Sequence, residues 1–153
     1  MKVLVQRVKK AVLYVEGNLK GEIGRGMVVF VGVGKNDKEE DSIYLANKVY
    51  SLRIFEDSSG KMTYSLNQID GEIMIVSQFT LYGDCRKGNR PDFTKAEKSQ
   101  IAYSLYKKFL EEMEKKEIKK IVSGEFGKKM LVEIHNDGPV TLIIESKNEN
   151  KNN

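Results

Sequence analysis

Short apolar runs separated by glycine-containing turns dominate the first third of the chain. The runs cover residues 3–5, 11–15, 19–23 and 27–33. Gly17-Asn18 and Gly24-Arg25-Gly26 supply turn residues between the later runs. Short strands joined by tight turns are typical of an antiparallel meander, whereas a parallel sheet needs longer crossover connections. The pattern therefore predicts a β-rich first third, with the polar pair Lys9-Lys10 separating its first two strands.

Two segments place apolar residues at helical spacing, and each follows residues that can cap a helix. In the first, Asn36 or Asp37 precedes an apolar stripe within residues 43–49. In the second, Thr94 and Glu97 form a capping-box pattern ahead of an apolar stripe within residues 102–113. We therefore expect two main helices, one on each side of the middle of the chain.

Three further apolar runs predict strands in the second half, at residues 73–76, 131–134 and 140–144. The run at 73–76 has no polar alternation, which is typical of a strand buried on both faces. Between the last two runs lies Asn136-Asp137-Gly138-Pro139. Because Asp-Gly between apolar runs favours a tight turn, this segment predicts a hairpin.

Composition limits the class of protein. At 153 residues the length predicts one domain, and 40% hydrophobic with 31% charged residues is ordinary for a globular chain. A net charge of +4 is compatible with a nucleic-acid partner. The single Cys85 excludes an intrachain disulfide. Residues 1–10 lack the apolar core of a secretory signal, and the longest apolar stretch, 27–33, is too short to span a bilayer, so we expect a cytoplasmic protein without membrane contact.

The usual catalytic sets are missing from the sequence. It has one histidine, His135, and one cysteine, so it has no His/Cys cluster of metal-ligand number, and it has no Gly-x-Ser-x-Gly elbow or phosphate-binding glycine loop. Ser77 and Thr80 remain as candidate hydroxyls at the end of an apolar run. Both are also common strand residues, so the residues alone leave a purely structural role open.

Two segments taken together resemble a known family. Ser77-Gln78-Phe79-Thr80-Leu81 and Asn136-Asp137-Gly138-Pro139-Val140-Thr141, in this order, resemble the two signature motifs of the D-aminoacyl-tRNA deacylases. The similarity extends to the flanks: Val3-Leu4-Val5-Gln6-Arg7-Val8, Gly88-Asn89-Arg90-Pro91 and Ser123-Gly124-Glu125-Phe126-Gly127, ending near Glu145. The resemblance implies a chiral proofreading hydrolase that cleaves the ester of D-aminoacyl-tRNA and releases tRNA and the D-amino acid.

The resemblance implies that Ser77, Gln78, Phe79 and Thr80 form the active-site strand, with Thr80 facing the ester. A threonine nucleophile needs an adjacent base, and the chain offers no dedicated histidine. Backbone N–H groups around Phe79 and Thr80 that stabilise the oxyanion suit the residues better. The free 2′-hydroxyl of the terminal ribose would then help to position or activate water, as the family is understood to lean on the RNA.

The second motif is expected to select the substrate by its chirality. In the family pattern the Gly138-Pro139 bond is cis, and the dipeptide enters the active site of the partner subunit of a homodimer. Its carbonyl groups accept the α-amino group of a D-amino acid and collide with an L-side chain, so discrimination comes from exclusion. Arg7 matches an arginine that steadies the motif. Because glycine has no side chain to reject, glycyl-tRNA, including glycine mischarged on tRNA(Ala), is an expected second substrate.

A polar loop is the candidate tRNA-binding segment. It carries Arg86, Lys87, Arg90 and Phe93, which could contact phosphates and stack on a base. A solvated surface loop is the alternative interpretation. Lys128 departs from the small residue that the family more often has after Phe-Gly.

The sequence and the resemblance together predict a single α+β domain over residues 1–145. Its sheet is expected to be curved, barrel-like and mostly antiparallel, with two main helices, and the polar residues 146–153 are expected to form a disordered tail. No metal or organic cofactor is implied. Two alternatives stay open: a non-catalytic RNA-binding module, and a hydrolase for another small ester with Thr80 as nucleophile.

Overall fold

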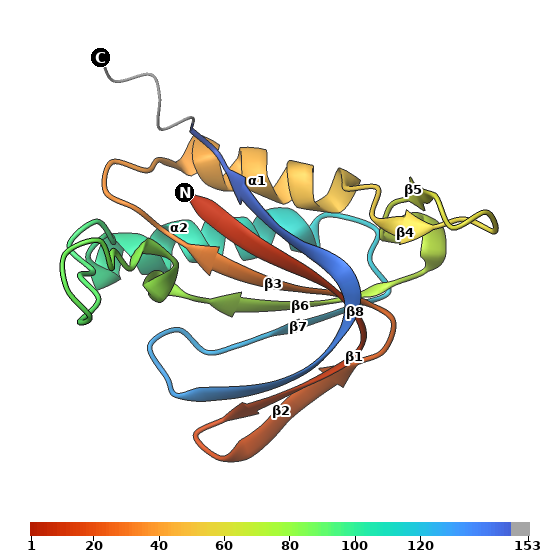
Figure 1. The fold of residues 1–153 in the computed structure, drawn as a ribbon, viewed down its shortest axis with the longest axis horizontal. Coiled ribbons are helices and arrows are strands. Elements are labelled where there is room, and N and C mark those ends of the chain that lie inside the picture. Colours follow the sequence, from red (N-terminus) through yellow and green to blue (C-terminus); the bar gives the residue numbers. More distant parts are fainter. Residues whose placement is uncertain (148–153) are drawn as a thin grey trace.

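The computed structural model describes residues 1–147 and places two helices over one face of a strongly curved sheet (Figure 1). The short 3-10 helices are labelled η. In chain order the elements are β1 (Lys2–Val15), β2 (Asn18–Ile23), β3 (Gly26–Gly32), α1 (Glu39–Ser51), β4 (Phe55–Glu56), β5 (Met62–Tyr64), η1 (Asn67–Ile69), β6 (Glu72–Ser77), η2 (Phe79–Tyr82), α2 (Ser99–Glu114), β7 (Lys120–Ser123) and β8 (Met130–Glu145).

The sheet is mixed, and the expected α+β class is confirmed. Its hydrogen-bonded order is β2-β1-β3-β6-β7, with β8 along the other side of β1. Strand β1 is antiparallel to β2, β3 and β8, whereas β6 is parallel to both β3 and β7. The two parallel pairs are those whose connections contain α1 and α2, as crossovers between parallel strands require. The meander expected for the first third therefore continues into two helix-containing crossovers.

The expected break at Lys9-Lys10 is wrong, because β1 is one continuous strand. Its first half pairs with β3 and its second half with β2, so the strand changes neighbours without ending. The ladder with β8 shifts register between Gln6 and Lys10, where the two lysines are exposed. Irregular pairing of this kind bends a strand and increases its twist. The bend lets β1 belong to both halves of the curved sheet.

Strand β6 separates two apolar clusters, as its unbroken apolar sequence predicts. Ile73 and Ile75 pack toward the helices, in a cluster that includes Phe109 of α2. Met74 and Val76 pack into the concave side of the sheet with residues of β1 and β2. Each face of a strand presents alternate residues, so one apolar run serves both clusters.

The two helices begin later than their sequence caps suggest. In α1, the Asp41 carboxylate accepts the Lys38 N–H at 2.7 Å, while Asp37 instead accepts the Gly34 N–H at 2.7 Å. In α2 the expected Thr94 cap is wrong, because helix α2 starts at Ser99. The Glu97 N–H donates to the Val33 carbonyl at 3.0 Å, which holds the segment before α2 against the end of β3.

The expected hairpin at Asn136-Pro139 is also wrong, because β8 runs through this segment as one strand. The Asn136 side-chain amide donates to the Arg7 carbonyl at 3.0 Å and to the Val140 carbonyl at 3.2 Å. These bonds bridge the residues that bulge from the ladder, so both halves of β8 stay paired with β1. The Gly138-Pro139 peptide bond within the bulge is cis.

The first two residues of the predicted tail contact the rest of the fold. The Ser146 N–H donates to the Met1 carbonyl at 2.9 Å, and the Lys147 ammonium lies 3.3 Å from Asp37 and 3.1 Å from Asp41. Positions 148–153 lie outside the described residues, so disorder there stays a prediction.

Asp41→Ala should lower the free energy of unfolding by about 1–2 kcal/mol, because it removes the acceptor for the Lys38 N–H at the start of α1. Burial opposes ionisation of Asp41, but hydrogen bonds from the Lys38 backbone and from Ser146 and Lys147 lower its pKa below the usual 3.8. The stabilisation by ionised Asp41 is therefore fully present at pH values above 3.8, and it is lost as the pH falls through the lowered pKa of the folded protein. Urea denaturation should show a large difference between wild type and variant at pH 7 and a smaller one at pH 3.

Glu40→Ala is the matched control, because Glu40 also lies in the acidic first turn of α1. It shares the charge–dipole interaction but makes no recorded side-chain hydrogen bond among the described residues. Equal losses for the two variants at pH 7 would contradict a role for the Asp41 hydrogen bond.

Candidate functional site

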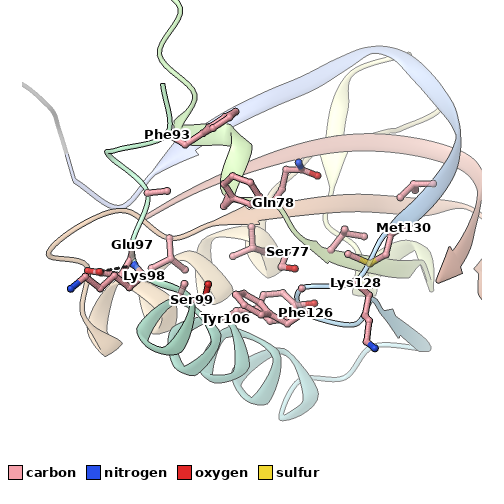
Figure 2. Close-up of a pocket in the computed structure, with 18 residues that line it drawn as sticks. Ser77, Gln78, Phe93, Glu97, Lys98, Ser99, Tyr106, Phe126, Lys128 and Met130 are labelled. Atoms are coloured by element: carbon pink, nitrogen blue, oxygen red, sulfur yellow. Dashed lines mark hydrogen bonds between the residues drawn. The ribbon is translucent and has the colours of Figure 1, made fainter. Parts of the chain in front are cut away.

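A cavity of about 560 Å³ opens where β3 and β6 end and α2 begins. Tyr106, Phe126 and Met130 contribute to its apolar lining, and Ser77 and Gln78 contribute polar groups. Figure 2 shows Lys98 and Ser99 on one side of it and Lys128 on the opposite side. The cavity therefore combines an apolar interior with a polar and cationic opening, as is common for sites that bind small molecules.

The end of β6 places the Ser-Gln-Phe-Thr segment at this opening. The Gln78 N–H donates to the Val31 carbonyl at 2.8 Å, one residue beyond the last β6 residue, and η2 then turns the chain away from the sheet. Within the described part of the chain, neither the Phe79 nor the Thr80 N–H donates a recorded hydrogen bond. Two backbone donors are thus available to an oxygen at the edge of the cavity.

The four residues of the expected active-site strand do not all line the cavity. Ser77, Gln78 and Phe79 do, whereas Thr80 is exposed and is not among the lining residues. The Gln78 side-chain amide donates to the Thr80 hydroxyl oxygen. The arrangement brings together the backbone of the segment and the Ser77 and Gln78 side chains, and leaves the Thr80 side chain at its margin.

Phe93 is the member of the expected tRNA-binding loop that reaches the cavity. Its ring packs edge-on against Phe79 with centroids 5.2 Å apart, although Phe79 is 57% and Phe93 36% exposed. Arg86, Lys87 and Arg90 are exposed and do not line the cavity.

The loop that carries Arg86 is closed by a pair of backbone hydrogen bonds between Asp84 and Asp92, at 2.8 and 2.9 Å. The Arg86 guanidinium pairs with the Asp84 carboxylate, and this hydrogen bond holds the pKa of Asp84 below its ordinary value. The positive charge of Arg86, which was expected to contact a phosphate, is therefore already paired with Asp84 inside the loop.

Several lining residues could not be recognised in the sequence. Tyr106 of α2 is only 2% exposed and belongs to the apolar core, and it also lines the cavity and donates a hydrogen bond to the Ile75 carbonyl at 3.3 Å. Burial raises the pKa of its hydroxyl, so Tyr106 stays protonated at neutral pH. Phe126 packs against Tyr106 with ring centroids 5.9 Å apart. In the sequence, only the match of the Ser-Gly-Glu-Phe-Gly stretch to the family indicated that Phe126 lies near the site.

Two lysines, Lys98 and Lys128, and one carboxylate, that of Glu97, line the cavity. Lys98 precedes the first turn of α2, and Lys128 follows Gly127 in the connection to β8. Within residues 1–147, no carboxylate pairs with either lysine within 4 Å. Lys128, which departs from the family pattern, thus adds a positive charge to the lining of the cavity.

Arg7 is buried and joins β4 to the bulge of β8. Only 4% of its side chain is exposed. Its guanidinium donates to the Ile54 carbonyl at 2.8 Å, to the Asp137 carbonyl at 3.2 Å and to the Gly138 carbonyl at 3.4 Å, and it pairs with the Asp137 carboxylate at 3.0 Å. Gly138 and Pro139 are exposed, and neither they nor Arg7 line the cavity of their own chain.

The described residues contain no group of three or more His, Cys, Asp or Glu side chains that could hold a metal ion. His135 is exposed on β8 and does not line the cavity. Over the same residues, neither helix has the length and apolar character needed to cross a bilayer.

Comparison with known proteins places the chain in a family. The model of the D-Tyr-tRNA(Tyr) deacylase family matches residues 4–145. A protein of Clostridium novyi named D-aminoacyl-tRNA deacylase is 54% identical over 149 residues, which cover 97% of this chain and 99% of the relative. A protein of the same name from Thermosipho melanesiensis is 50% identical over 147 residues, covering 96% and 98% of the two chains.

Two solved structures are similar to this chain. A structure named c-Myc DNA Unwinding Element Binding Protein superposes with a TM-score of 0.89 at 41% identity and covers 97% of this chain and all of its own. A structure described as a probable eukaryotic D-amino acid tRNA deacylase has the same fold, with a TM-score of 0.79 at 20% identity over 94% of this chain and 98% of its own. With a family model that spans nearly the whole chain and relatives at half identity, this chain belongs to the D-Tyr-tRNA(Tyr) deacylase family.

Proposed function

We propose that the protein hydrolyses the ester bond of D-aminoacyl-tRNA and releases free tRNA and the D-amino acid. The observation that carries the proposal is the pair of unused N–H groups of Phe79 and Thr80 beside the cavity, within the segment that resembles the family's active-site motif. The names of the relatives, D-aminoacyl-tRNA deacylase, support the same substrate class. A protein that acts on this substrate is expected in the cytoplasm, where aminoacyl-tRNA is found.

The chemistry rests on backbone donors and on water. Water attacks the ester carbonyl carbon, and the oxyanion that forms accepts hydrogen bonds from the Phe79 and Thr80 N–H groups. The bond to the ribose oxygen then breaks, and that oxygen takes the proton that the water loses. No histidine lines the cavity, and the Thr80 hydroxyl already accepts a bond from Gln78. The 2′-hydroxyl of the terminal ribose orients the water, so holding a reactive ester in place supplies much of the rate.

The surroundings of the segment suit the end of an RNA chain. Lys98 and Lys128 place positive charge at the opening, where a phosphate would be attracted. The exposed rings of Phe79 and Phe93 offer apolar surface on which a base can stack.

Selection of the D-isomer is assigned to Gly138 and Pro139 of the second subunit of a homodimer. Both residues are exposed, and Arg7 holds the bulge that carries them through the Asp137 and Gly138 carbonyls. They do not line the cavity of their own chain, which supports a role at the cavity of a partner subunit. Their carbonyl groups bind the α-amino group of a D-aminoacyl ester and exclude an L-side chain, and glycyl-tRNA passes the same filter.

Exposed apolar residues on β8 support a dimer. Ile143 is 66% exposed, and Leu131 and Leu142 on the same strand are also exposed. Within the described residues β8 pairs with β1 alone, so its other edge is free. An unpaired apolar edge of this kind favours association with a second copy about a two-fold axis.

Nucleic-acid binding without hydrolysis is the second candidate function. It is favoured by the 41% identical solved structure, whose name describes a protein that binds a DNA unwinding element.

The protein should hydrolyse D-tyrosyl-tRNA and leave L-tyrosyl-tRNA intact, because the L-side chain meets the Gly138-Pro139 carbonyls. Release of labelled tyrosine from matched D- and L-tyrosyl-tRNA at equal concentration gives the measurement. Equal rates on the two isomers would end the proofreading proposal. Tight binding of both with no release would support nucleic-acid binding alone.

Thr80→Ala should reduce kcat less than about tenfold, because the backbone and the RNA carry the chemistry. Replacing the terminal 2′-hydroxyl of D-tyrosyl-tRNA by hydrogen should reduce kcat by about 10²-fold or more. Single-turnover hydrolysis measures both. If Thr80→Ala abolishes hydrolysis while the variant still folds and binds tRNA, Thr80 is the nucleophile and the scheme is wrong.

A mixture of two inactive variants should regain activity if the sites are shared. Phe79→Pro removes an oxyanion donor. Proline is tolerated because Phe79 is the first residue of η2, its N–H has no recorded partner, and Gln78, with φ −148° and ψ 83°, lies outside the helical region that proline disfavours in the preceding residue. Gly138→Phe has room for the added Cβ in its own chain, since nothing lies within 4 Å of it, and the ring is expected to block the cavity of a partner.

Each mixed dimer then has one intact site, so random mixing should restore about a quarter of the wild-type rate. Mixing two differently tagged samples of Phe79→Pro gives the control and should restore nothing. A fully active monomer, or a mixture that stays inactive, would show that each site is built from one chain.

A further inference from the structure

A second hollow, of about 840 Å³, lies directly behind the walls of the cavity. The 3-10 helix η2 separates the two, with Phe79 lining the cavity and Leu81 and Tyr82 lining the hollow. The segment before α2 divides in the same way, since Phe93 lines the cavity and Lys95 lines the hollow. Two segments, η2 and the residues before α2, therefore lie between the cavity and the hollow.

The Tyr82 ring forms a firm floor for this hollow. It packs so closely on Gly34 that an added Cβ there would lie 2.6 Å from the ring. The Lys2 ammonium lies 4.5 Å from the centroid of the same ring. Burial, together with the nearby Asp37 carboxylate, raises the pKa of the Tyr82 hydroxyl, so this floor carries no negative charge of its own.

The hollow has more cations than carboxylates among the described residues. Its cations are the N-terminal ammonium of Met1 and the side chains of Lys2, Lys35, Arg86, Lys95 and Lys147, and its carboxylates are Asp37, Asp84 and Glu145. The carboxylates are already engaged: Glu145 lies 3.3 Å from Lys2, Asp37 lies 3.3 Å from Lys147, and Asp84 pairs with both Arg86 and Lys95. The surplus charge of the walls is therefore positive.

Two lysines face each other at the rim of the hollow. Gly34 and Ala96 form an antiparallel bridge, and the Lys35 N–H donates to the Lys95 carbonyl at 3.0 Å, so the two lysines are directly opposed. Like charges in such a pair repel each other. Lys95 lies 3.6 Å from Asp84, whereas no carboxylate of residues 1–147 pairs with Lys35 within 4 Å. An anion bound between Lys35 and Lys95 would relieve this repulsion.

We propose that the hollow behind η2 binds backbone phosphates of the tRNA acceptor strand, just before the terminal nucleotide that occupies the cavity. The inference rests on the proposed function and names a binding surface for its substrate. From Phe79 to Tyr82 a 3-10 helix advances about 6 Å. Stacked nucleotides advance about 3.4 Å each, so two or three nucleotides span the wall between the two spaces. The opposed lysines, rather than the tip of the Arg86 loop, are then the main phosphate contact.

The test compares Lys35→Ala, Lys95→Ala and the double variant on two substrates. One substrate is D-tyrosyl-tRNA, and the other is the D-tyrosyl ester of adenosine, which has the reacting bond but no phosphate. Lys107→Ala is the matched control, because Lys107 is exposed on α2 and lines neither space. All the changed side chains are exposed, so thermal unfolding should be the same for every variant.

The double variant should raise KM for D-tyrosyl-tRNA about tenfold and leave kcat unchanged. The slope of log(kcat/KM) against log[salt] should become shallower by about 0.7 for each lysine removed. Rates on the adenosine ester should equal those of wild type. Equal losses on both substrates, or no loss on either, would overturn the proposal.

Two further measurements separate the sources of phosphate and distinguish this proposal from the proposed function. If the double change removes binding of inorganic phosphate but leaves tRNA kinetics intact, the hollow is a site for free phosphate and the RNA assignment is wrong. If wild type hydrolyses neither ester, the proposed function fails, and the inference is tested on uncharged tRNA instead. Filter binding should then show weaker binding for the double variant than for Lys107→Ala, and equal binding would overturn the inference.

Discussion

Strand β6 packs against the helices through Ile73 and Ile75 and into the concave interior through Met74 and Val76, so it has no face open to water. A strand in this position can expose polar groups only where it leaves the sheet. That point is Ser77, after which Gln78 makes one more bond to β3 and the chain turns into η2. Burial of β6 therefore decides where backbone N–H groups become available. The cavity beside them is bounded by the segment before α2 and by the first turns of that helix, which begins at Ser99.

A second constraint acts at Arg7. A buried guanidinium is tolerated only when its donors are satisfied, and here carbonyls of Ile54, Asp137 and Gly138 accept them, with the Asp137 carboxylate alongside. The bond network joins β1, the start of β4 and the bulge of β8. The bulge therefore carries its exposed residues on a fixed base, as the proposed contact with a second subunit requires.

The helix η2 lies between the cavity and the hollow and therefore has two roles. One side of this short helix carries Phe79 and the free donors beside the cavity, and the other carries Tyr82 on the floor of the lysine-lined hollow. In the proposed arrangement, charge on one side holds the RNA backbone while donors on the other side act on the ester. Because phosphate contacts are independent of sequence, such a division would let one site serve many tRNAs while the chirality filter works on the amino acid alone.

Local pattern was sufficient for most elements, and the resemblance to a family indicated the candidate active-site segment. Unbroken apolar sequence identified β6 as doubly buried, helical spacing identified α1 and α2, and two short motifs located the Ser-Gln-Phe-Thr and Gly-Pro segments. Only tertiary pairing decided the rest. Strands β1 and β8 continue through polar or turn-like residues because neighbouring strands bond them on both sides of the irregularity, which no local preference records. Thr94 fails as a cap because Glu97 bonds to Val33 across the fold. Tyr106 belongs to the apolar core and Phe126 packs against it, and only their positions in the fold show that they also line the cavity.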